Sequence, residues 1–253
     1  MSYRLLTPVA LGLGLALALP VAMAAVAQPE PNTLSDQEKA DGFKLLFDGK
    51  SLKGWHSYLQ KGTGKDWKVS DGAIVLEKHI KDDPADFADL VTNDEYDNFD
   101  LKLEWRMTPC ADSGVMFYVH ESSEYHYTWA TGPEMQIADL TCTRPDSTTL
   151  YERSGDLFDL ISSNVEWVHE SPQWNQFEII AKDGHVQFFQ NGHKVVETQL
   201  WDEKWKALVA GTKFAKMPGY AKYRKGHISL QGDEDKGSEP IHITFRSIRI
   251  KPL

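Results

Sequence analysis

Apolar and polar residues alternate at every second position over much of this chain. Glu134 and Gln136 fall on one side of such a stretch, and Met135 and Ile137 fall on the other. Residues 100–107 alternate in the same way. A period of two is typical of a β-strand that buries one face. The pattern therefore predicts a strand in each segment, with charged or amide side chains on the face away from the core.

Turn signals separate further alternating segments. Asp71-Gly72, Asp183-Gly184 and Asn191-Gly192 each lie between two such segments, which indicates hairpins. The one helix that the pattern predicts is short and lies near 200–208. Strands and helices do not alternate regularly along the chain, so the pattern does not indicate a parallel sheet. Roughly a dozen short strands at this spacing predict an all-β sandwich or barrel.

The beginning of the chain has the composition of an export signal. Arg4 is followed by an apolar run and then by small residues at two suitable cleavage positions, so a signal peptide is predicted over 1–27. Residues 28–40 are polar and contain proline, which predicts a linker, and 41–253 is predicted to be one domain. No later segment has the roughly 18 apolar residues that span a bilayer. We therefore expect a periplasmic or secreted protein with no integral membrane segment after cleavage.

Charge and cysteine content narrow the classes of partner. The formal net charge is −10 and no basic tract offsets it, which argues against nucleic acid. The two cysteines, Cys110 and Cys142, lie in turn-like sequence, and in an exported protein they predict a disulfide; the alternative is two buried thiols. Two cysteines do not make a zinc site. No cofactor is predicted, and a divalent cation held by loop oxygens is left open.

Polar faces recur on three predicted strands, and aromatic residues precede one of them. If the apolar sides pack into the sandwich, the polar sides line one concave outer face, which is the usual setting of a binding site. Planar polar groups beside aromatic rings suit a sugar, which has hydroxyl groups at its edge and C–H groups on its faces. The three polar sets are Lys102, Glu104 and Arg106; Glu134 and Gln136; and His227, Ser229 and Gln231.

The order of several motifs resembles one known family. The motifs run through nearly the whole of 41–253 and include Gly42-Phe43-x-x-Leu46-Phe47-Asp48-Gly49-Lys50-Ser51-Leu52-x-Gly54-Trp55, Tyr96-x-Asn98-Phe99-x-Leu101-x-Leu103-Glu104-Trp105-Arg106, Ser113-Gly114-Val115, Thr131-Gly132-Pro133-Glu134-x-Gln136 and Gly226-His227-Ile228-x-Leu230-Gln231. This looks like the 3-keto-disaccharide hydrolase family, formerly a domain of unknown function. The resemblance implies a concanavalin A-like antiparallel β-sandwich, a jelly roll, with its site on the concave face.

The resemblance also implies a reaction. A ketone at carbon 3 of a sugar acidifies the proton on carbon 2, so that a base can remove it and the group on carbon 1 can leave. Such a reaction needs a base, a group that stabilises the enolate and an acid for the leaving oxygen. We expect Glu134 or His227 as the base and Arg106 or a bound cation beside the enolate. Glu104 is either the acid or an ion-pair partner of Arg106.

A second group of residues is predicted to bind the carbohydrate substrate: Gln136, Gln231, Tyr127, Trp129 and His126. Two alternatives remain open at this point. One is a conventional glycoside hydrolase that uses paired carboxylates, and the other is a carbohydrate-binding module without catalytic activity.

Overall fold

The computed structural model describes residues 30–78, 89–138, 151–163, 165, 167–232 and 241–253. The signal peptide predicted for 1–27 lies outside these residues, so it stays a prediction, and so does export. Within the described ranges, no helix has the length and apolar character needed to cross a membrane.

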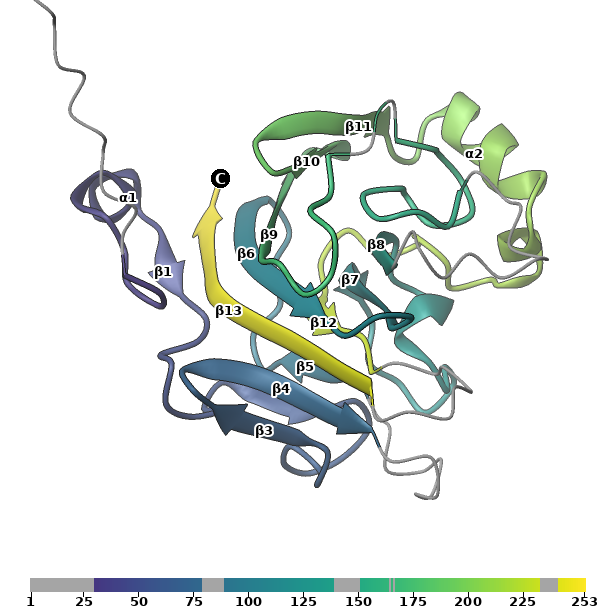
Figure 1. Cartoon of the computed structure of the whole chain (residues 1–253). Helices are drawn as coiled ribbons and strands as arrows, with labels where there is room; N and C mark the ends of the chain where they lie inside the picture. The colour runs from purple at the N-terminus through teal and green to yellow at the C-terminus, as the bar shows by residue number, and fades with distance from the viewer. Residues whose placement is uncertain (1–29, 79–88, 139–150, 164, 166, 233–240) are drawn as a thin grey trace, which may run out of the picture.

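Two antiparallel sheets make up the protein (Figure 1). The eight-stranded sheet has the order β11-β10-β9-β6-β13-β4-β3, with β1 paired to β13. Its strands are β1 (Lys44–Leu45), β3 (Trp67–Ser70), β4 (Ala73–Lys78), β6 (Phe99–Met107), β9 (Asn175–Lys182), β10 (His185–Gln190), β11 (His193–Gln199) and β13 (Ile241–Pro252).

The five-stranded sheet has the order β2-β5-β12-β7-β8. Its strands are β2 (Trp55–Ser57), β5 (Leu90–Thr92), β7 (Asp112–Val119), β8 (Glu134–Ala138) and β12 (His227–Leu230). The predicted all-β sandwich is therefore confirmed, because nearly all regular structure is antiparallel strand.

The core forms between the two sheets, where the alternating apolar residues meet. Leu101, Leu103 and Trp105 of β6 are at most 1% exposed, and the polar residues between them face away from the core. From the other sheet, Phe117 of β7 reaches Phe99 of β6 with ring centroids 6.1 Å apart. Period-two burial of this kind fixes which side of each strand faces inward.

Short helices lie at the margins of the sheets. The helix predicted near 200–208 is α2 (Glu203–Ala210), whose N-cap Asp202 accepts a hydrogen bond from Trp205 N at 2.7 Å. Two 3₁₀ turns matter for the site, η2 (Thr128–Ala130) and η4 (Lys213–Lys216).

The stretch predicted as a linker, 28–40, contains a short helix over its described part and contacts the sandwich. Ser35 and Glu38 form a capping box that starts α1 (Asp36–Asp41). Glu38 also forms an ion pair with Arg249 of β13. The Ser-x-x-Glu spacing is a recognised helix start, and it is the signal that the prediction of a linker overlooked.

Candidate functional site

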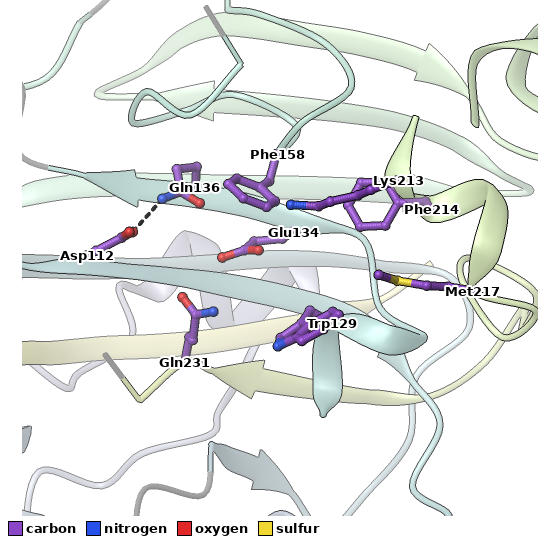
Figure 2. Close-up of a pocket in the computed structure, with 9 residues that line it drawn as sticks. All are labelled: Asp112, Trp129, Glu134, Gln136, Phe158, Lys213, Phe214, Met217 and Gln231. Atoms are coloured by element: carbon purple, nitrogen blue, oxygen red, sulfur yellow. Dashed lines mark hydrogen bonds between the residues drawn. The ribbon is translucent and has the colours of Figure 1, made fainter. Parts of the chain in front are cut away.

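A pocket of about 270 Å³ opens on the face of the five-stranded sheet that points away from the core (Figure 2). Strands β7 and β8 form its floor, and η2, η4 and the segment 151–163 form its walls. The lining residues are Asp112, Trp129, Glu134, Gln136, Phe158, Lys213, Phe214, Met217 and Gln231.

Glu134 lies at the centre of the pocket in Figure 2 and is only 4% exposed. It is the first residue of β8 and stands opposite Met116 of β7. Its side chain crosses the neighbouring Gly114, where an added Cβ would lie 2.6 Å from Cδ and 2.7 Å from Cγ of Glu134. The glycine in the Ser-Gly-Val motif is therefore required by the path of this carboxylate, not by backbone conformation.

Amide groups lie on one side of Glu134. Gln136 Nε2 donates a hydrogen bond to Asp112 Oδ1 at 2.6 Å, and Figure 2 shows this pair together at one end of the pocket. Gln231 follows β12, and its backbone N donates to the carbonyl of Gly114 at 2.9 Å. The adjacent strands β12, β7 and β8 therefore gather two amides and a carboxylate at this end, which suits the hydroxyl groups of a sugar.

Lys213 supplies a positive charge to the wall of the pocket. Its Nζ lies 3.3 Å from Asp159 Oδ2, 4.3 Å from the ring centroid of Phe158 and 5.3 Å from that of Phe214. A carboxylate and two aromatic faces hold an ammonium group by charge and by cation–π attraction. The backbone N of Phe158 donates to the carbonyl of Glu134 at 3.1 Å, which ties this wall to the floor.

Tyr220 packs behind the wall of the pocket that carries Lys213. Its ring stacks on Phe214, with centroids 3.8 Å apart and planes 9° apart. Burial, and then the charges of Glu134 and Asp159, raise the pKa of Tyr220 well above its usual range. Tyr220 therefore stays a neutral phenol, and it contributes no negative charge that would oppose those two carboxylates.

The structure separates Glu104 and Arg106 from the pocket, so the expectation of one face shared by three strands is wrong for β6. Both side chains lie on the outer face of the eight-stranded sheet. Glu104 Oε2 accepts a hydrogen bond from Arg246 Nε at 2.5 Å. The guanidinium groups of Arg106 and Arg246 lie 4.7 and 3.9 Å from the ring centroid of Trp174. Alternation showed that these residues face solvent but could not show on which sheet.

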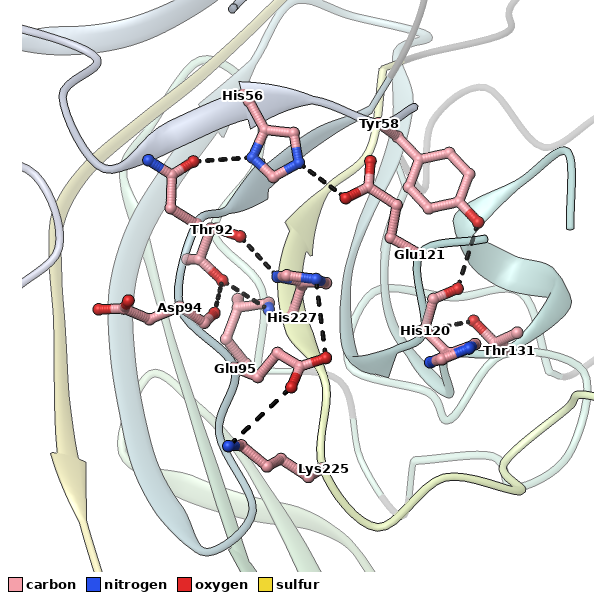
Figure 3. A network of polar contacts seen from close by, with 12 residues as sticks. His56, Tyr58, Thr92, Asp94, Glu95, His120, Glu121, Thr131, Lys225 and His227 are labelled. Carbon is pink, nitrogen blue, oxygen red and sulfur yellow. Dashed lines mark hydrogen bonds and ion pairs between the residues drawn. The ribbon is translucent and has the colours of Figure 1, made fainter. Parts of the chain in front are cut away.

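His227 lies on the five-stranded sheet but in a different polar network (Figure 3). Its Nδ1 donates to the carbonyl of Thr92 at 2.7 Å, and its Nε2 lies 3.8 Å from Glu95 Oε1. The ring meets that of His56 edge-on at 5.9 Å, and His56 Nε2 lies 3.0 Å from Glu121 Oε2.

The position of His227 in the sheet separates it from Glu134. His227 pairs with Val119 of β7, whereas Glu134 pairs with Met116. Strand spacing places the two roughly 10 Å apart across the sheet and roughly 10 Å apart along it. His227 is not among the residues that line the pocket around Glu134.

The predicted aromatic binding residues divide between the pocket and its rim. Trp129 lines the pocket. Tyr127 is not among the lining residues, but its ring stacks on Trp129 with centroids 4.8 Å apart and planes 10° apart. His126 is exposed and does not line the pocket.

The predicted disulfide is only partly within the described residues. Cys110 is disulfide-bonded. Cys142 lies outside the described residues, so the pairing of the two stays a prediction. Among the residues that are described, no three His, Cys, Asp or Glu side chains are grouped so that they could hold a metal ion.

Five lining residues were not predicted from the sequence: Asp112, Phe158, Lys213, Phe214 and Met217. Asp112 directly precedes the Ser-Gly-Val motif, and this position could have identified it as a candidate site residue from the sequence. The others come from irregular segments, where no period marks the side chains that turn towards a distant strand.

A model of the 3-keto-alpha-glucoside-1,2-lyase-like domain matches residues 42–251. The chain belongs to this family. The match covers both sheets, including the pocket, and it confirms the resemblance that the sequence motifs carry.

Named relatives agree with the family. A 3-keto-disaccharide hydrolase from Bacteroides thetaiotaomicron is 25% identical over 244 residues, which cover 88% of this chain and 83% of the relative. A crystal structure of a candidate glycosyl hydrolase from Parabacteroides distasonis is 29% identical, with a TM-score of 0.78, and the match covers 88% of this chain and 100% of that one. A second such structure from the same organism is 25% identical, with a TM-score of 0.61, and the match covers 83% and 99%. The chain is therefore a carbohydrate-active, hydrolase-like protein.

Proposed function

We propose that this protein cleaves 3-keto glycosides by removing the proton on carbon 2, expelling the group on carbon 1 and then adding water. The observation that carries the proposal is that a buried carboxylate, Glu134, and the ammonium group of Lys213 line one pocket together with the amides of Gln136 and Gln231. A base and a cation beside hydroxyl-binding groups are what an enolate-forming reaction on a sugar requires.

The reaction balances without an oxidant or reductant. The base takes the proton from carbon 2, and the C–H electron pair forms a double bond to carbon 3, whose oxygen becomes the enolate. That electron pair then forms a double bond between carbons 1 and 2 as the bond from carbon 1 to the leaving oxygen breaks. Water adds to carbon 1 of the resulting enone as hydroxide, and a proton held by the base returns to carbon 2. The remaining proton of the water goes to the leaving oxygen, so the net change is hydrolysis.

The residues of the pocket divide these tasks. Glu134 takes the proton from carbon 2 and returns one to it during hydration. Lys213 stabilises the negative charge on oxygen 3, which replaces the role first considered for Arg106. Gln136 and Gln231 bind ring hydroxyl groups, and Asp112 orients the Gln136 amide through their hydrogen bond.

A conventional glycoside hydrolase would use Glu134 and Asp112 as its pair of carboxyl groups, since both line the pocket. The two mechanisms differ at carbon 2, because direct hydrolysis leaves the bond from that carbon to its hydrogen intact.

The test is incubation of the purified protein with a glucoside and its 3-keto counterpart in heavy water. We expect cleavage of the 3-keto substrate alone and deuterium at carbon 2 of the product, above the slow exchange of the same sugar without protein. Full-rate cleavage of the ordinary glucoside without label would refute the elimination.

Two matched variants assign the base. Glu134→Gln keeps the shape of the side chain but removes its basicity, so turnover should fall about 10²-fold or more, as is typical when a general base is lost. Glu104→Gln makes the same chemical change on the eight-stranded sheet and should leave turnover unchanged. Equal effects of the two substitutions would remove Glu134 from the mechanism.

We also propose that the protein acts outside the cytoplasm, on the basis of residues 1–27. Fractionation of the host cells, with amino-terminal sequencing of the mature protein, tests this proposal. Recovery of the uncleaved chain in the cytoplasm would contradict it.

A further inference from the structure

The pocket has a polar end and an apolar end, and the sheet register sets their order. Asp112, Gly114 and Met116 follow one another on the same side of β7, and they pair with Ala138, Gln136 and Glu134 of β8. The amides and Asp112 therefore lie on one side of Glu134, at the start of β7. The apolar lining residues Trp129 and Met217 lie on the other side in Figure 2.

The turn that carries Trp129 is anchored at the apolar end. Thr128 is fully buried, and its Oγ1 lies within hydrogen-bonding distance of both an Asp89 carboxylate oxygen and Met116 Sδ. Trp129 also packs against the buried cluster of Tyr58, Val91, Met116 and Val119. The indole is therefore fixed in place before any ligand arrives.

Tyr127 continues the wall beyond the pocket. Its ring is nearly parallel to that of Trp129, at 10°, and the tyrosine is 50% exposed although it does not line the pocket. An aromatic ring that is held by stacking and still presents half its surface to water offers a ready contact for the C–H face of a ligand. The two rings together extend the apolar end from beside Glu134 outward to solvent.

We infer that Tyr127 and Trp129 form a subsite for the leaving group of the substrate, and that the favoured substrates carry a leaving group with a broad C–H or aromatic face, such as a second sugar ring or a phenyl ring. The inference rests on the proposed function for its orientation. The hydroxyl-rich keto sugar occupies the amide end, its carbon 2 lies at Glu134, and the group on carbon 1 extends towards the apolar end. A small alkyl leaving group would not reach Tyr127.

The test compares three 3-keto glucosides that differ only in their leaving group: methyl, glucosyl and 4-nitrophenyl. Tyr127→Ala should raise KM about 3–10-fold for the glucosyl and nitrophenyl substrates and leave the methyl substrate unchanged, since one aromatic contact is lost. Tyr127→Phe keeps the ring and should behave as the wild type. Trp167→Ala is the matched control, because Trp167 is also exposed, at 42%, and stacked, on His193, but lies outside the pocket lining.

The outcomes separate this inference from the proposed function. An equal loss on all three substrates, or a Phe variant as weak as the Ala variant, would overturn the subsite. If no 3-keto glucoside is cleaved, binding of the three compounds by calorimetry replaces KM. A Tyr127-dependent preference for the larger leaving groups would then support the subsite while the reaction fails, and the absence of any such preference would overturn both.

Discussion

Replacing Gly114 with alanine is the most direct test of the reasoning about the pocket, because it moves Glu134 without altering its chemistry. The added Cβ would lie 2.6 Å from the carboxyl carbon of Glu134, and ordinary contact begins at 3.4 Å. Oε1 of Glu134 lies closer still to the added Cβ, so the carboxyl group must retreat by at least about 0.8 Å. Misplacing a reacting group by about 1 Å costs about 10²-fold in rate. We expect a fall of that order in kcat/KM, equivalent to about 2.7 kcal/mol of transition-state stabilisation.

The same substitution should leave the fold intact. Gly114 is not among the residues with positive φ, so alanine can adopt its backbone conformation. The loss of unfolded-state entropy would by itself stabilise the protein by about 0.4–1 kcal/mol, which offsets part of the steric cost. The melting temperature should therefore shift by only a few degrees.

The assay is release of the leaving group from a 3-keto glucoside, measured beside two controls. Gly211→Ala is the matched glycine substitution, because its added Cβ would meet its nearest neighbour, Leu208 O, at 3.4 Å, which is ordinary contact. It should keep wild-type activity. The second control is the double variant with Glu134→Gln: if Gly114 acts through Glu134, the two losses should not multiply. Wild-type activity of Gly114→Ala, or fully multiplicative losses, would refute the assignment of Glu134.

Three further predictions follow from other parts of the structure. Lys213→Gln should lower kcat more than it raises KM for a 3-keto substrate, because the charge acts on the enolate and less on the ground state; an effect on KM alone would contradict this role. Burial, only partly opposed by the charge of Lys102, raises the pKa of Asp100 to about 6. The folded protein therefore binds a proton at Asp100 more tightly than the unfolded chain does. The stability that this protonation contributes is lost as pH rises through about 6. Thermal melts at pH 5 and pH 7.5 should therefore show Asp100→Asn gaining stability over the wild type at the higher pH, and a constant difference would count against the shift. A bond between Cys110 and Cys142 should make the unreduced chain two hydrogens lighter by mass spectrometry and stabilise the fold by roughly 3–4 kcal/mol, whereas two alkylated thiols in oxidised protein would exclude it.

The family, the sandwich and the inward faces of its strands could be read from the sequence, because these depend on short-range order. Leu101, Leu103 and Trp105 repeat with the period of a strand, and burial of that side follows whatever the partners of β6 are. Glu134 and Gln136 were found in the same way, since side chains two residues apart share a face. The capping box at Ser35 was equally local and was overlooked.

The choice of sheet for each polar face was decided only by the tertiary structure. Glu104 and Glu134 both stand on the sides of alternating strands that face away from the core, but β6 pairs with β9 and β13 of the eight-stranded sheet, whereas β8 pairs with β7 of the five-stranded sheet. Alternation records which side of a strand is polar and carries no information about which distant strand lies beside it. Lys213 shows the same limit, because it comes from a 3₁₀ turn with no repeating pattern and meets Phe158 and Asp159 only after the chain has folded over β8. The parts of the site set by side-chain period were therefore predictable, and the parts set by long-range pairing were not.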